Sequence, residues 1–393
     1  MPPSIIVRPM RDEERTHVRS LQQRSFNVPY RLRSKPPEPA TGELRVAELD
    51  GTIVAALRVM RFGHFFGGRA VPAAGIGGVA VAPEARGHRV AEQMMIETMR
   101  ELHAAGVPLS ALYPATVPLY RRVGYEYGGF RIRYRAALRN LPRAGDLECV
   151  PWGDEDFDQI EACYRSWASG SSGPIDRPRG WWNDRILSAS EEEDLFRVCV
   201  REDGQITGYM IYTQQRHPPS EWQFDLDMRD FVWTTQAAAT AILTYAGRHR
   251  SNALDLIWTG PPNDPLANLL PEQDADRDSW FRPMFRLVDV PGALEARGYP
   301  PAINAAVELR VKDPGVPAND AGWRLEVSGG EGKVAPTSAA APSVDVGTLS
   351  AIWSGMLPAR DAQRLGRLAA DDDTVQTMDQ LFAGPFPWIN DWF

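Results

Sequence analysis

The stretch Gly75-Ile-Gly-Gly-Val-Ala-Val-Ala-Pro-Glu-Ala-Arg86-Gly-His-Arg89-Val-Ala91 decides the fold of this 393-residue chain. Its small and β-branched residues up to Pro83 predict a strand, and the pattern from about Val90 to Ala105 predicts a helix. A basic turn that contains a glycine joins the two. Such a turn presents free backbone N–H groups and the positive end of a helix dipole at one point, where Arg86 and Arg89 add charge. The stretch therefore predicts a diphosphate-binding loop.

The spacing of the loop separates it from two other phosphate-binding loops. A Walker loop ends in Gly-Lys-Ser/Thr and a dinucleotide fingerprint needs three glycines, and neither pattern is present. The pattern Val-x-Val-x-Pro-x-x-Arg-Gly-x-x-x-Ala resembles the acetyl-CoA loop of the GNAT acetyltransferases, where Arg-x-x-Gly-x-Gly/Ala holds the CoA pyrophosphate. Arg89 stands where most of that superfamily has glycine, so its side chain either narrows the approach to the phosphate or binds it. For the loop alone, an ordinary strand–turn–helix with solvated arginines is the alternative.

A second signature follows at the distance that a GNAT domain requires. Val107–Tyr113 predicts a buried strand, and the segment Leu119-Tyr120-Arg-Arg-Val-Gly124-Tyr125 comes soon after it. This segment resembles the GNAT signature Phe/Leu-Tyr-x-x-x-Gly-Tyr/Phe, a short helix that closes the thiol end of the cofactor. In GNAT enzymes the strand before it splays from its neighbour, and pantetheine lies in the gap. Two linked signatures in this order are far more specific than either alone.

Length and composition exclude several classes of protein. A chain of 393 residues predicts two or three domains, and 43% apolar with 24% charged residues is ordinary for a soluble globular protein. No apolar run approaches the roughly 18 residues of a membrane helix, and the N-terminus does not resemble a signal peptide. We therefore expect a cytoplasmic protein without a membrane span.

The net charge and the spacing of the cysteines and histidines limit which ligands and partners the chain is expected to bind. The net charge of −8 argues against nucleic acid and mildly favours cationic partners. The three cysteines (Cys149, Cys163 and Cys199) contain no Cys-x-x-Cys pair, and the six histidines show no metal-ligand spacing. The sequence thus predicts neither a disulfide framework nor a metal site.

The middle of the chain repeats the order of the first part. Glu43–Val59 predicts a hairpin with an Asp-Gly turn, and Leu195–Tyr212 predicts the same hairpin again. Each is followed by an apolar strand, a helix and another strand, which in the second copy are 230–233, 235–248 and 253–258. The second copy has no Pro-x-x-Arg-Gly loop. A duplicated fold that has lost its phosphate cradle is the preferred interpretation, and unrelated α/β elements are the alternative.

The C-terminal third differs in composition. Strands are predicted near 305–312 and 323–327, a mobile low-complexity loop at 328–342, and helices at 347–355, 359–368 and 373–381. The chain ends in Phe382-Ala-Gly-Pro-Phe-Pro-Trp388-Ile-Asn-Asp391-Trp392-Phe393. Each aromatic side chain buries roughly 150–250 Å² when docked, so this tail is expected to insert into something. Docking on the core of its own domain is the alternative.

This assembly resembles one family, the Eis ("enhanced intracellular survival") acetyltransferases. The resemblance covers the whole chain, with specific motifs at 79–91, 115–125 and 393. It implies an α+β (α/β) fold: tandem GNAT acyltransferase domains followed by a sterol-carrier-protein-like α/β domain. The implied domains are an acetyl-CoA-binding GNAT domain at 1–140, a degenerate GNAT domain at 141–288, and a sterol-carrier-like domain at 289–393 whose C-terminal carboxylate enters the active site. A homo-hexamer, arranged as a dimer of trimers, is also implied.

The resemblance also implies the site residues. Tyr120 would be the general acid and the α-carboxylate of Phe393 the general base. Further residues would contact acetyl-CoA through β-strand amides, the pyrophosphate loop or the strand gap, namely Val79, Ala80, Val81, Arg86, Gly87, His88, Arg89, Val90, Ala91, Ala115 and Thr116. The chain departs from the aminoglycoside-acetylating members at two places where acidic residues are expected: it reads Ser25-Phe26-Asn27-Val28 after the first helix, and Trp392 before the end.

Elementary chemistry agrees with these roles. An alkylamine has a pKa near ~10.4, so a base must take its proton before it attacks a thioester. An α-carboxylate with a pKa of roughly 3.5 is a weak base, but burial among Trp388, Trp392 and its own phenyl ring would raise that pKa. A thiolate leaves with a pKa of about 8.5, and a phenol near ~10 can supply its proton. Tyr120 is chosen over Tyr113 and Tyr125 by its matching position; plain packing is the alternative.

Two functions from different classes follow. The first is an acetyl-CoA-dependent N-acetyltransferase acting on primary amines of a cationic small molecule, such as an aminoglycoside-like polyamine, or on lysine side chains. The second is a non-catalytic CoA-sensing or lipid-carrier protein built on the sterol-carrier-like domain. The intact loop and Tyr120 favour the enzyme. The adjacent Trp181 and Trp182 are open to two interpretations, a substrate pocket or, preferably, core packing.

Overall fold

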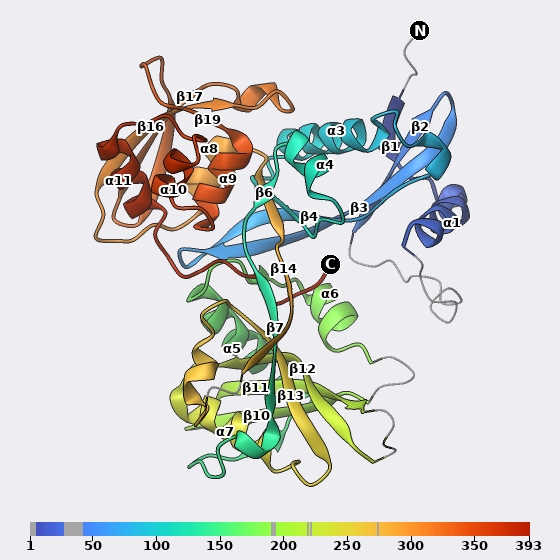
Figure 1. Ribbon diagram of the computed structural model, residues 1–393, viewed down its shortest axis with the longest axis vertical. Coiled ribbons are helices and arrows are strands. Elements are labelled where there is room, and N and C mark those ends of the chain that lie inside the picture. Colours follow the sequence, from blue (N-terminus) through green and yellow to red (C-terminus); the bar gives the residue numbers. More distant parts are fainter. Residues whose placement is uncertain (1–4, 27–41, 190–193, 218–219, 221, 273–274) are drawn as a thin grey trace. The chain divides into compact units, whose positions relative to one another are not determined.

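The structure, a computed structural model, describes residues 5–26, 42–189, 194–217, 220, 222–272 and 275–393 (Figure 1). The chain forms two compact units. Unit 1 comprises Met1–Gly129, Arg282–Pro385 and Phe393, and unit 2 comprises Phe130–Phe281 and Phe386–Trp392. The first and last thirds of the sequence therefore belong to one unit, and the middle third with most of the tail belongs to the other.

Unit 1 contains a mixed sheet with the strand order β1-β2-β3-β4-β5-β15-β6. The predicted hairpin is confirmed: Asp50 and Gly51 both have positive φ, as a tight turn between antiparallel strands requires. β4 pairs with β5 in parallel, and α3 is the crossover helix that connects the two strands. This helix begins at Val90, as predicted. The elements are β1 (Ile5–Pro9), α1 (Arg15–Phe26), β2 (Glu43–Leu49), β3 (Thr52–Phe66), β4 (Arg69–Val81), α3 (Val90–Ala104), β5 (Leu109–Leu112), α4 (Val117–Arg122), β6 (Glu126–Tyr127) and β15 (Met284–Leu287).

The core of this part of unit 1 explains why α3 forms where it does. The helix buries one stripe, with side chains at spacings of three and four residues: Val90, Met94, Met95, Thr98, Met99 and Leu102. This stripe packs on apolar residues of β2, β3 and β4 in one cluster that also contains Tyr120 and Tyr125. Burial of the α3 stripe fixes the first turn of the helix at the end of β4.

The C-terminal part of unit 1 has its own sheet, ordered β18-β17-β16-β19. Here the prediction of a mobile loop at 328–342 is wrong, because it contains β18, which pairs with β17. Gly329 and Gly330 both take positive φ and make the tight turn that allows this pairing. The elements are α8 (Val290–Ala296), β16 (Ala305–Lys312), β17 (Gly322–Ser328), β18 (Glu331–Pro336), β19 (Ser343–Asp345), α9 (Val346–Ser354), α10 (Ala359–Arg364) and α11 (Asp372–Leu381).

Unit 2 repeats the plan of the first sheet, with the strand order β14-β7-β13-β12-β11-β10-β8. The hairpin β10–β11 leads to β12, which crosses through α7 to the parallel strand β13. This order supports duplication over unrelated elements. The elements are β7 (Arg131–Ala137), β8 (Cys149–Pro151), α5 (Phe157–Ser169), β9 (Ile175–Asp176), α6 (Arg179–Trp181), a π-helical turn (Trp182–Ile186), β10 (Phe196–Glu202), β11 (Gln205–Arg216), β12 (Phe224–Trp233), α7 (Gln236–Gly247), β13 (Ala253–Gly260) and β14 (Asp276–Phe281).

The two GNAT-like sheets exchange strands along the chain. β7 lies before the predicted boundary at 140, yet it pairs with β13 and β14 of unit 2. β15 lies before the predicted boundary at 288, yet it pairs with β5 and β6 of unit 1. The division into units therefore differs from a simple linear cut at these two places.

Candidate active site

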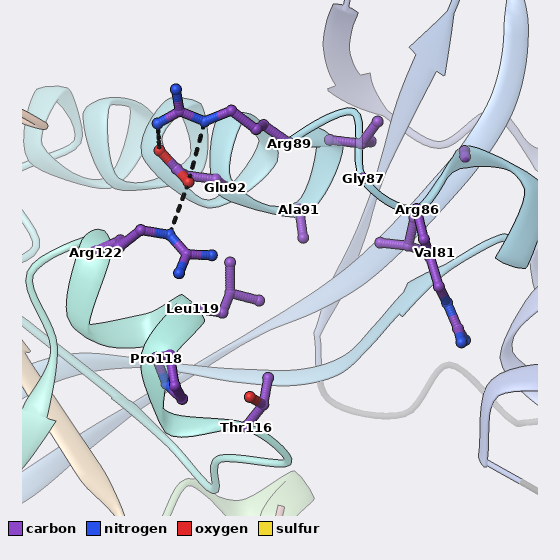
Figure 2. A pocket seen from close by; sticks show the side chains of 12 residues that line it. Val81, Arg86, Gly87, Arg89, Ala91, Glu92, Thr116, Pro118, Leu119 and Arg122 are labelled. Carbon is purple, nitrogen blue, oxygen red and sulfur yellow. Dashed lines mark hydrogen bonds and ion pairs between the residues drawn. The ribbon is translucent and has the colours of Figure 1, made fainter.

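A cavity of about 470 Å³ lies in unit 1 between the first turn of α3 and α4 (Figure 2). The end of β4 and the loop after it complete its walls. The side chains around it are mostly small or basic, which suits a ligand whose phosphates approach the backbone. The lining residues are Val81, Ala85, Arg86, Gly87, Arg89, Val90, Ala91, Glu92, Thr116, Pro118, Leu119 and Arg122.

The loop in front of α3 has the backbone shape of an anion-binding turn. Gly87 has φ +87, and a Cβ added there would meet nothing within 4 Å, so the space beside it is open. Arg89 is the N-cap of α3 with φ 58 and ψ 20, and its side chain makes no capping hydrogen bond. Arg89 thus keeps the left-handed conformation for which glycine is usual, and the first amides of α3 have no side-chain cap.

Opposite charges meet at one wall of this cavity. Arg122 Nε donates to Glu92 at 3.0 Å, and Arg89 also pairs with Glu92, which lies in the first turn of α3 (Figure 2). The hydrogen bond from Arg89 lowers the pKa of the Glu92 carboxyl. Sequence reasoning missed Arg122 and Glu92, although the spacing of three residues between Arg89 and Glu92 on a helix was a signal for this pair.

The structure gathers seven of the predicted cofactor residues around the cavity: Val81, Arg86, Gly87, Arg89, Val90, Ala91 and Thr116. Four others are beside it rather than in its lining. Val79 and Ala80 precede Val81 on β4, and Ala115 precedes Thr116. The ring of His88 lies with Nδ1 3.3 Å from the Ala85 carbonyl oxygen, so it supports the loop from within.

β4 and β5 separate next to this cavity. Their parallel ladder ends at the pair Ile76 and Leu112, and β4 continues to Val81. Opposite β3, the register shifts where Gly78 takes φ +61, which is a β-bulge. Among the described strands, the last part of β4 pairs only on its β3 side. The splay that the GNAT resemblance implies is therefore present between β4 and β5.

Phe393, the last residue of the sequence, packs beside β4. The ring of Phe393 packs edge-on against Phe62 (centroids 5.1 Å apart) and Tyr113 (5.2 Å). A Cβ added to Gly77 would lie 3.6 Å from the terminal carboxyl carbon, and one added to Gly75 would lie 3.0 Å from the Phe393 ring. The two glycines therefore let the C-terminus approach β4 where β4 leaves β5.

The burial of that carboxylate by Trp388 and Trp392 stays a prediction. Within unit 2, Trp388 packs against Trp167, and Trp392 is 46% exposed and packs against Phe281. Phe393 packs against a ring of β3 and against Tyr113, which follows β5, all within unit 1. Residues Phe386–Trp392 belong to unit 2.

Tyr120 lies on α4 with its ring buried in the core of unit 1. Its ring packs edge-on against that of Tyr125, with centroids 6.1 Å apart, and it is not part of the cavity lining. Burial raises the pKa of Tyr120 to about 12. Within the described residues its hydroxyl makes no hydrogen bond, and the residue is only 5% exposed.

A buried ion pair holds the end of α4. Arg286 on β15 donates from Nε to the Val123 carbonyl oxygen at 2.8 Å, and from Nη2 to both carboxylate oxygens of Asp313 at 2.8 and 2.9 Å. Gly124 leaves room for this arginine, since an added Cβ would lie 2.9 Å from Arg286 Nε. The third-domain residue Asp313 thereby fixes the turn that follows Tyr120.

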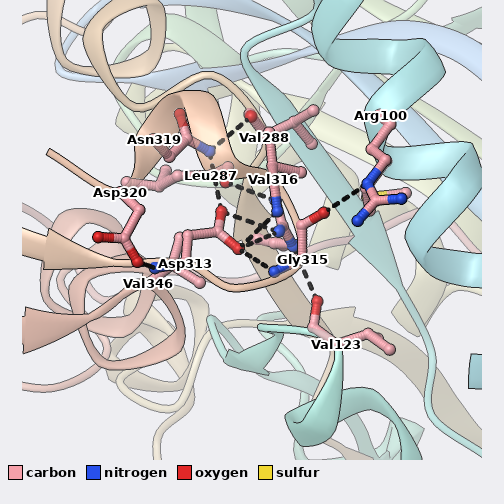
Figure 3. Close-up of polar contacts among 12 residues, drawn as sticks. Arg100, Val123, Leu287, Val288, Asp313, Gly315, Val316, Asn319, Asp320 and Val346 are labelled. Carbon is pink, nitrogen blue, oxygen red and sulfur yellow. Dashed lines mark hydrogen bonds and ion pairs between the residues drawn. The ribbon is translucent and has the colours of Figure 1, made fainter.

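The loop after β16, which contains Asp313, also contacts α3 (Figure 3). Asp313 accepts hydrogen bonds from the backbone of Gly315 and Val316 and from Asn319, which shapes the loop after β16. The carbonyl oxygen of Gly315 then accepts a hydrogen bond from Arg100 Nε of α3 at 2.9 Å. Both helices that flank the cavity are therefore tied to one loop of the C-terminal segment.

Loss of the Asp313 carboxylate is expected to destabilise the protein. Asp313→Ala leaves the guanidinium of Arg286 buried without its charge partner, which costs about 3–5 kcal/mol in other proteins. Urea unfolding followed by tryptophan fluorescence measures the change. Glu308→Ala removes a partly exposed partner of Arg324 and is the control, with an expected loss below about 0.5 kcal/mol. Equal effects of the two variants would contradict the structural role of Asp313.

Replacing Arg89 separates its backbone effect from its charge. Arg89→Gly relieves the left-handed strain, of order 1 kcal/mol, and Arg89→Ala retains it, so only the glycine variant should be more stable. Both variants lose the guanidinium, and we expect both to weaken acetyl-CoA binding by about tenfold, the effect of one charge-assisted hydrogen bond. Calorimetric titration measures the affinity. Tighter binding by Arg89→Gly would show that the side chain obstructs the phosphate.

In the part of the chain that the structure describes, no cluster of three or more His, Cys, Asp or Glu side chains could hold a metal ion. The three cysteines are free thiols. Within the same residues, no helix is long and apolar enough to span a membrane. Asn27 and Val28, part of the predicted departure after the first helix, lie outside the described residues.

Family profiles match three segments of the chain. Residues 6–128 match an acetyltransferase (GNAT) domain, residues 173–287 match a second acetyltransferase (GNAT) domain, and residues 290–390 match a sterol carrier protein domain. The tandem GNAT plan followed by a sterol-carrier-like domain is therefore confirmed. The match at 173–287 lacks the phosphate loop, as the sequence indicated.

Relatives of this chain occur in several bacteria. An uncharacterized N-acetyltransferase of Streptomyces avermitilis is 30% identical over 302 residues, 71% of this chain and 70% of that protein. The N-acetyltransferase Eis of Mycobacterium tuberculosis is 25% identical over 335 residues, covering 81% and 79% of the two chains.

Solved structures extend the likeness over the full length. A GCN5-related N-acetyltransferase from Anabaena variabilis superposes with a TM-score of 0.93 at 28% identity, covering 99% of this chain and 100% of the other. Eis1 from Mycobacterium abscessus shares the fold, with a TM-score of 0.80 at 22% identity and coverage of 99% and 100%. This chain is an N-acetyltransferase of the GNAT type, and it is similar over most of its length to the Eis N-acetyltransferases.

Proposed function

We propose that this enzyme acetylates primary amines of a cationic acceptor, an aminoglycoside-like polyamine or a lysine side chain, with acetyl-CoA as donor. Tyr120 is the general acid and the α-carboxylate of Phe393 is the general base in this proposal. The observation that carries it is the approach of the terminal carboxyl group to Gly77, where β4 separates from β5. A carboxylate beside an open strand edge is suited to receive a proton from an amine that attacks there.

The cavity fits the pyrophosphate of CoA by its chemistry. Arg86, Arg89 and Arg122 line it, Gly87 leaves open space, and the uncapped first turn of α3 offers N–H donors. These groups would hold the phosphates, and Thr116 would lie beside the chain that leads toward the strand gap. Bound acetyl-CoA supplies the activated acetyl group. The N–H groups of Val79–Val81, on the splayed part of β4, would polarise a carbonyl oxygen as an oxyanion site.

The Phe393 carboxylate would take the proton of the acceptor. Ordinary α-carboxylates have a pKa of roughly 3.5, far below that of an alkylammonium near ~10.4. The rings of Phe62 and Tyr113 pack edge-on against the Phe393 ring and so hold the terminal residue in place. A negative group also attracts the ammonium form of the substrate before the proton moves.

Tyr120 would act on the other side of the reaction. The sequence argument used an ordinary phenol near ~10, but burial raises the pKa of Tyr120 to about 12, which makes it a weaker acid than a thiol at about 8.5. Complete proton transfer to a thiolate is therefore uphill. The hydroxyl is best suited to donate a hydrogen bond as negative charge develops on the departing sulfur, with the proton following as the product leaves.

The charge of the protein supports a cationic acceptor but does not identify it. The net charge of −8 favours polyamines and lysine-rich segments over anionic substrates. A hexameric assembly and a cytoplasmic location stay predictions.

A thiol-release assay tests the proposal against the carrier alternative. The intact enzyme is mixed with acetyl-CoA and a panel of aminoglycosides, polyamines and lysine peptides, and free CoA is measured with a thiol reagent. We expect release above the amine-free rate with at least one primary amine and none with its N-acetylated form. Absence of release with every amine, together with binding of acetyl-CoA, would favour a non-catalytic CoA sensor or lipid carrier.

A further inference from the structure

Arg177 is buried in unit 2 together with two aspartates. Its guanidinium donates to both carboxylate oxygens of Asp230, from Nη1 at 2.7 Å and from Nη2 at 2.9 Å. Its Nε donates to the carboxylate of Asp391 at 3.1 and 3.2 Å. All three side chains are at most 2% exposed. Asp391 is the third residue from the C-terminus, so a fully buried ion pair secures the end of the chain.

Aromatic side chains complete this cluster. The Arg177 guanidinium lies 4.0 Å from the ring centroid of Tyr164 and 4.7 Å from that of Trp182, which adds cation–π attraction on both sides. Trp181 Nε1 donates to Asp391 at 2.9 Å, and the Tyr209 hydroxyl donates to Asp230 at 2.7 Å. The paired tryptophans are thus core residues, as preferred from the sequence, and they surround the anchor of the tail.

The backbone before Asp391 is held in the same unit. Phe130 and Trp388 form an isolated parallel bridge, and the Ile389 amide donates to the Phe130 carbonyl oxygen at 2.9 Å. The Trp388 amide donates to Ser172 at 2.9 Å, and a Cβ added to Gly173 would lie 2.3 Å from the Trp388 carbonyl oxygen. Backbone contacts therefore fix residues 387–389, and Arg177 fixes the next point along the tail.

We propose that Arg177 is a positioning residue for the C-terminal carboxylate, because it holds Asp391 and so limits the positions that Phe393 can occupy. Two peptide units, about 7 Å of extended chain, separate Asp391 from Phe393. A tail fixed at Asp391 delivers its end with little loss of conformational entropy at each turnover. The proposal rests on the proposed role of Phe393 as general base.

The composition of the cluster provides a clean variant. Asp391→Ala removes the side-chain carboxylate that Arg177 binds in the tail and keeps the terminal carboxylate of Phe393. Arg177 keeps its pair with Asp230, so one buried positive and one buried negative charge remain paired. The fold of unit 2 should therefore survive this change. The matched control is Asp227→Ala, which removes another aspartate of unit 2 that pairs with an arginine, Arg133 at 2.8 Å, and does not contact the tail.

The rate at which a carboxypeptidase removes Phe393 measures how often the tail leaves its bound position. The full-length protein and its variants are digested under native conditions, and mass spectrometry follows the loss of the terminal residue. Release requires the tail to leave its site, so its rate reports the free energy of that opening. We expect Asp391→Ala to accelerate release by about tenfold or more, the effect of one buried charged hydrogen bond. Asp227→Ala should leave the rate unchanged.

A second variant keeps the test independent of one substitution. Arg177→Lys retains the charge but loses the planar fork, so it cannot pair with both aspartates in the same geometry, and faster release is expected again. Release from Asp391→Ala and Arg177→Lys at the rate of the Asp227→Ala control would overturn the proposal. Turnover is measured in parallel. Faster release in both variants with unchanged turnover would support the positioning role of Arg177 and contradict the role of the terminal carboxylate as base. The failure of one proposal is therefore distinguishable from the failure of the other.

Discussion

Tyr120→Phe is expected to lower kcat by about 10²–10⁴-fold, the usual contribution of one positioned proton donor. The substitution removes one hydroxyl and keeps the ring that packs against Tyr125 in the core of unit 1. Tyr120 does not line the cavity that fits the CoA pyrophosphate, so the affinity for acetyl-CoA should not change. Steady-state kinetics with a saturating amine give kcat, and calorimetric titration gives the affinity.

Tyr125→Phe is the matched control. The Tyr125 hydroxyl bonds Ser110 Oγ at 2.6 Å, and Ser110 bonds the Ala74 carbonyl oxygen, so this phenol is engaged inside the core. Its loss should reduce stability by about 1 kcal/mol and leave most of the turnover. Equal loss of turnover and acetyl-CoA affinity in Tyr120→Phe would instead make Tyr120 a structural residue.

The pH dependence gives a further check on Tyr120. Burial raises its pKa to about 12, so the phenol stays protonated at every pH below that value. A donor that is fully protonated adds no descending limb to the profile of kcat between pH 6 and 10. Any limb seen there belongs to another group, and it should persist in the residual activity of Tyr120→Phe.

Local patterns in the sequence were sufficient to predict the strand, the turn and the helix around Arg86. The start of α3 at Val90 follows from its apolar spacing, and the hairpin with Asp50 and Gly51 follows from its turn residues. The sequence left two roles open for Arg89. The structure resolves its backbone, which takes the left-handed form, because burial of the α3 stripe fixes the helix start whatever residue precedes it.

Long-range pairs left no such pattern. Arg286 and Val123 are 163 positions apart, and Arg177 and Asp391 are 214 positions apart, so no window of sequence contains both members. A single arginine in a strand predicts a solvated side chain more often than a buried one. The exchange of β7 and β15 between sheets was hidden for the same reason, because strand order in a sheet depends on tertiary packing.

The error at residues 328–342 has a different cause. The segment contains repeated Gly, Ala, Ser and Pro, a composition that predicts a loop. Its first part nevertheless forms β18, because the Gly329–Gly330 turn returns the chain along β17, whose backbone groups then pair with it. Pairing with a neighbouring strand outweighed a weak local preference.

Changing the C-terminus should reduce turnover by an amount comparable to that of Tyr120→Phe. A short Gly-Ser extension after Phe393 moves the free carboxylate away from Gly77, and a C-terminal amide keeps the length but removes the charge. Both should lower kcat by about 10²–10⁴-fold, because the amine then loses the base that the proposal assigns to it. Acetyl-CoA affinity should be preserved, since Phe393 does not line the phosphate cavity.

Phe393→Leu separates the carboxylate from the ring. Leucine keeps the terminal carboxylate and most of the apolar contact with Phe62 and Tyr113, so most of the turnover should remain. The amidated protein lacks the negative charge of the terminal carboxylate, and Phe393→Leu retains it. Both proteins keep the chain length. Full activity of the amidated or extended protein would contradict the base role. Equal loss in Phe393→Leu and the amide would show that the ring, through packing at the splay of β4 and β5, matters more than the charge.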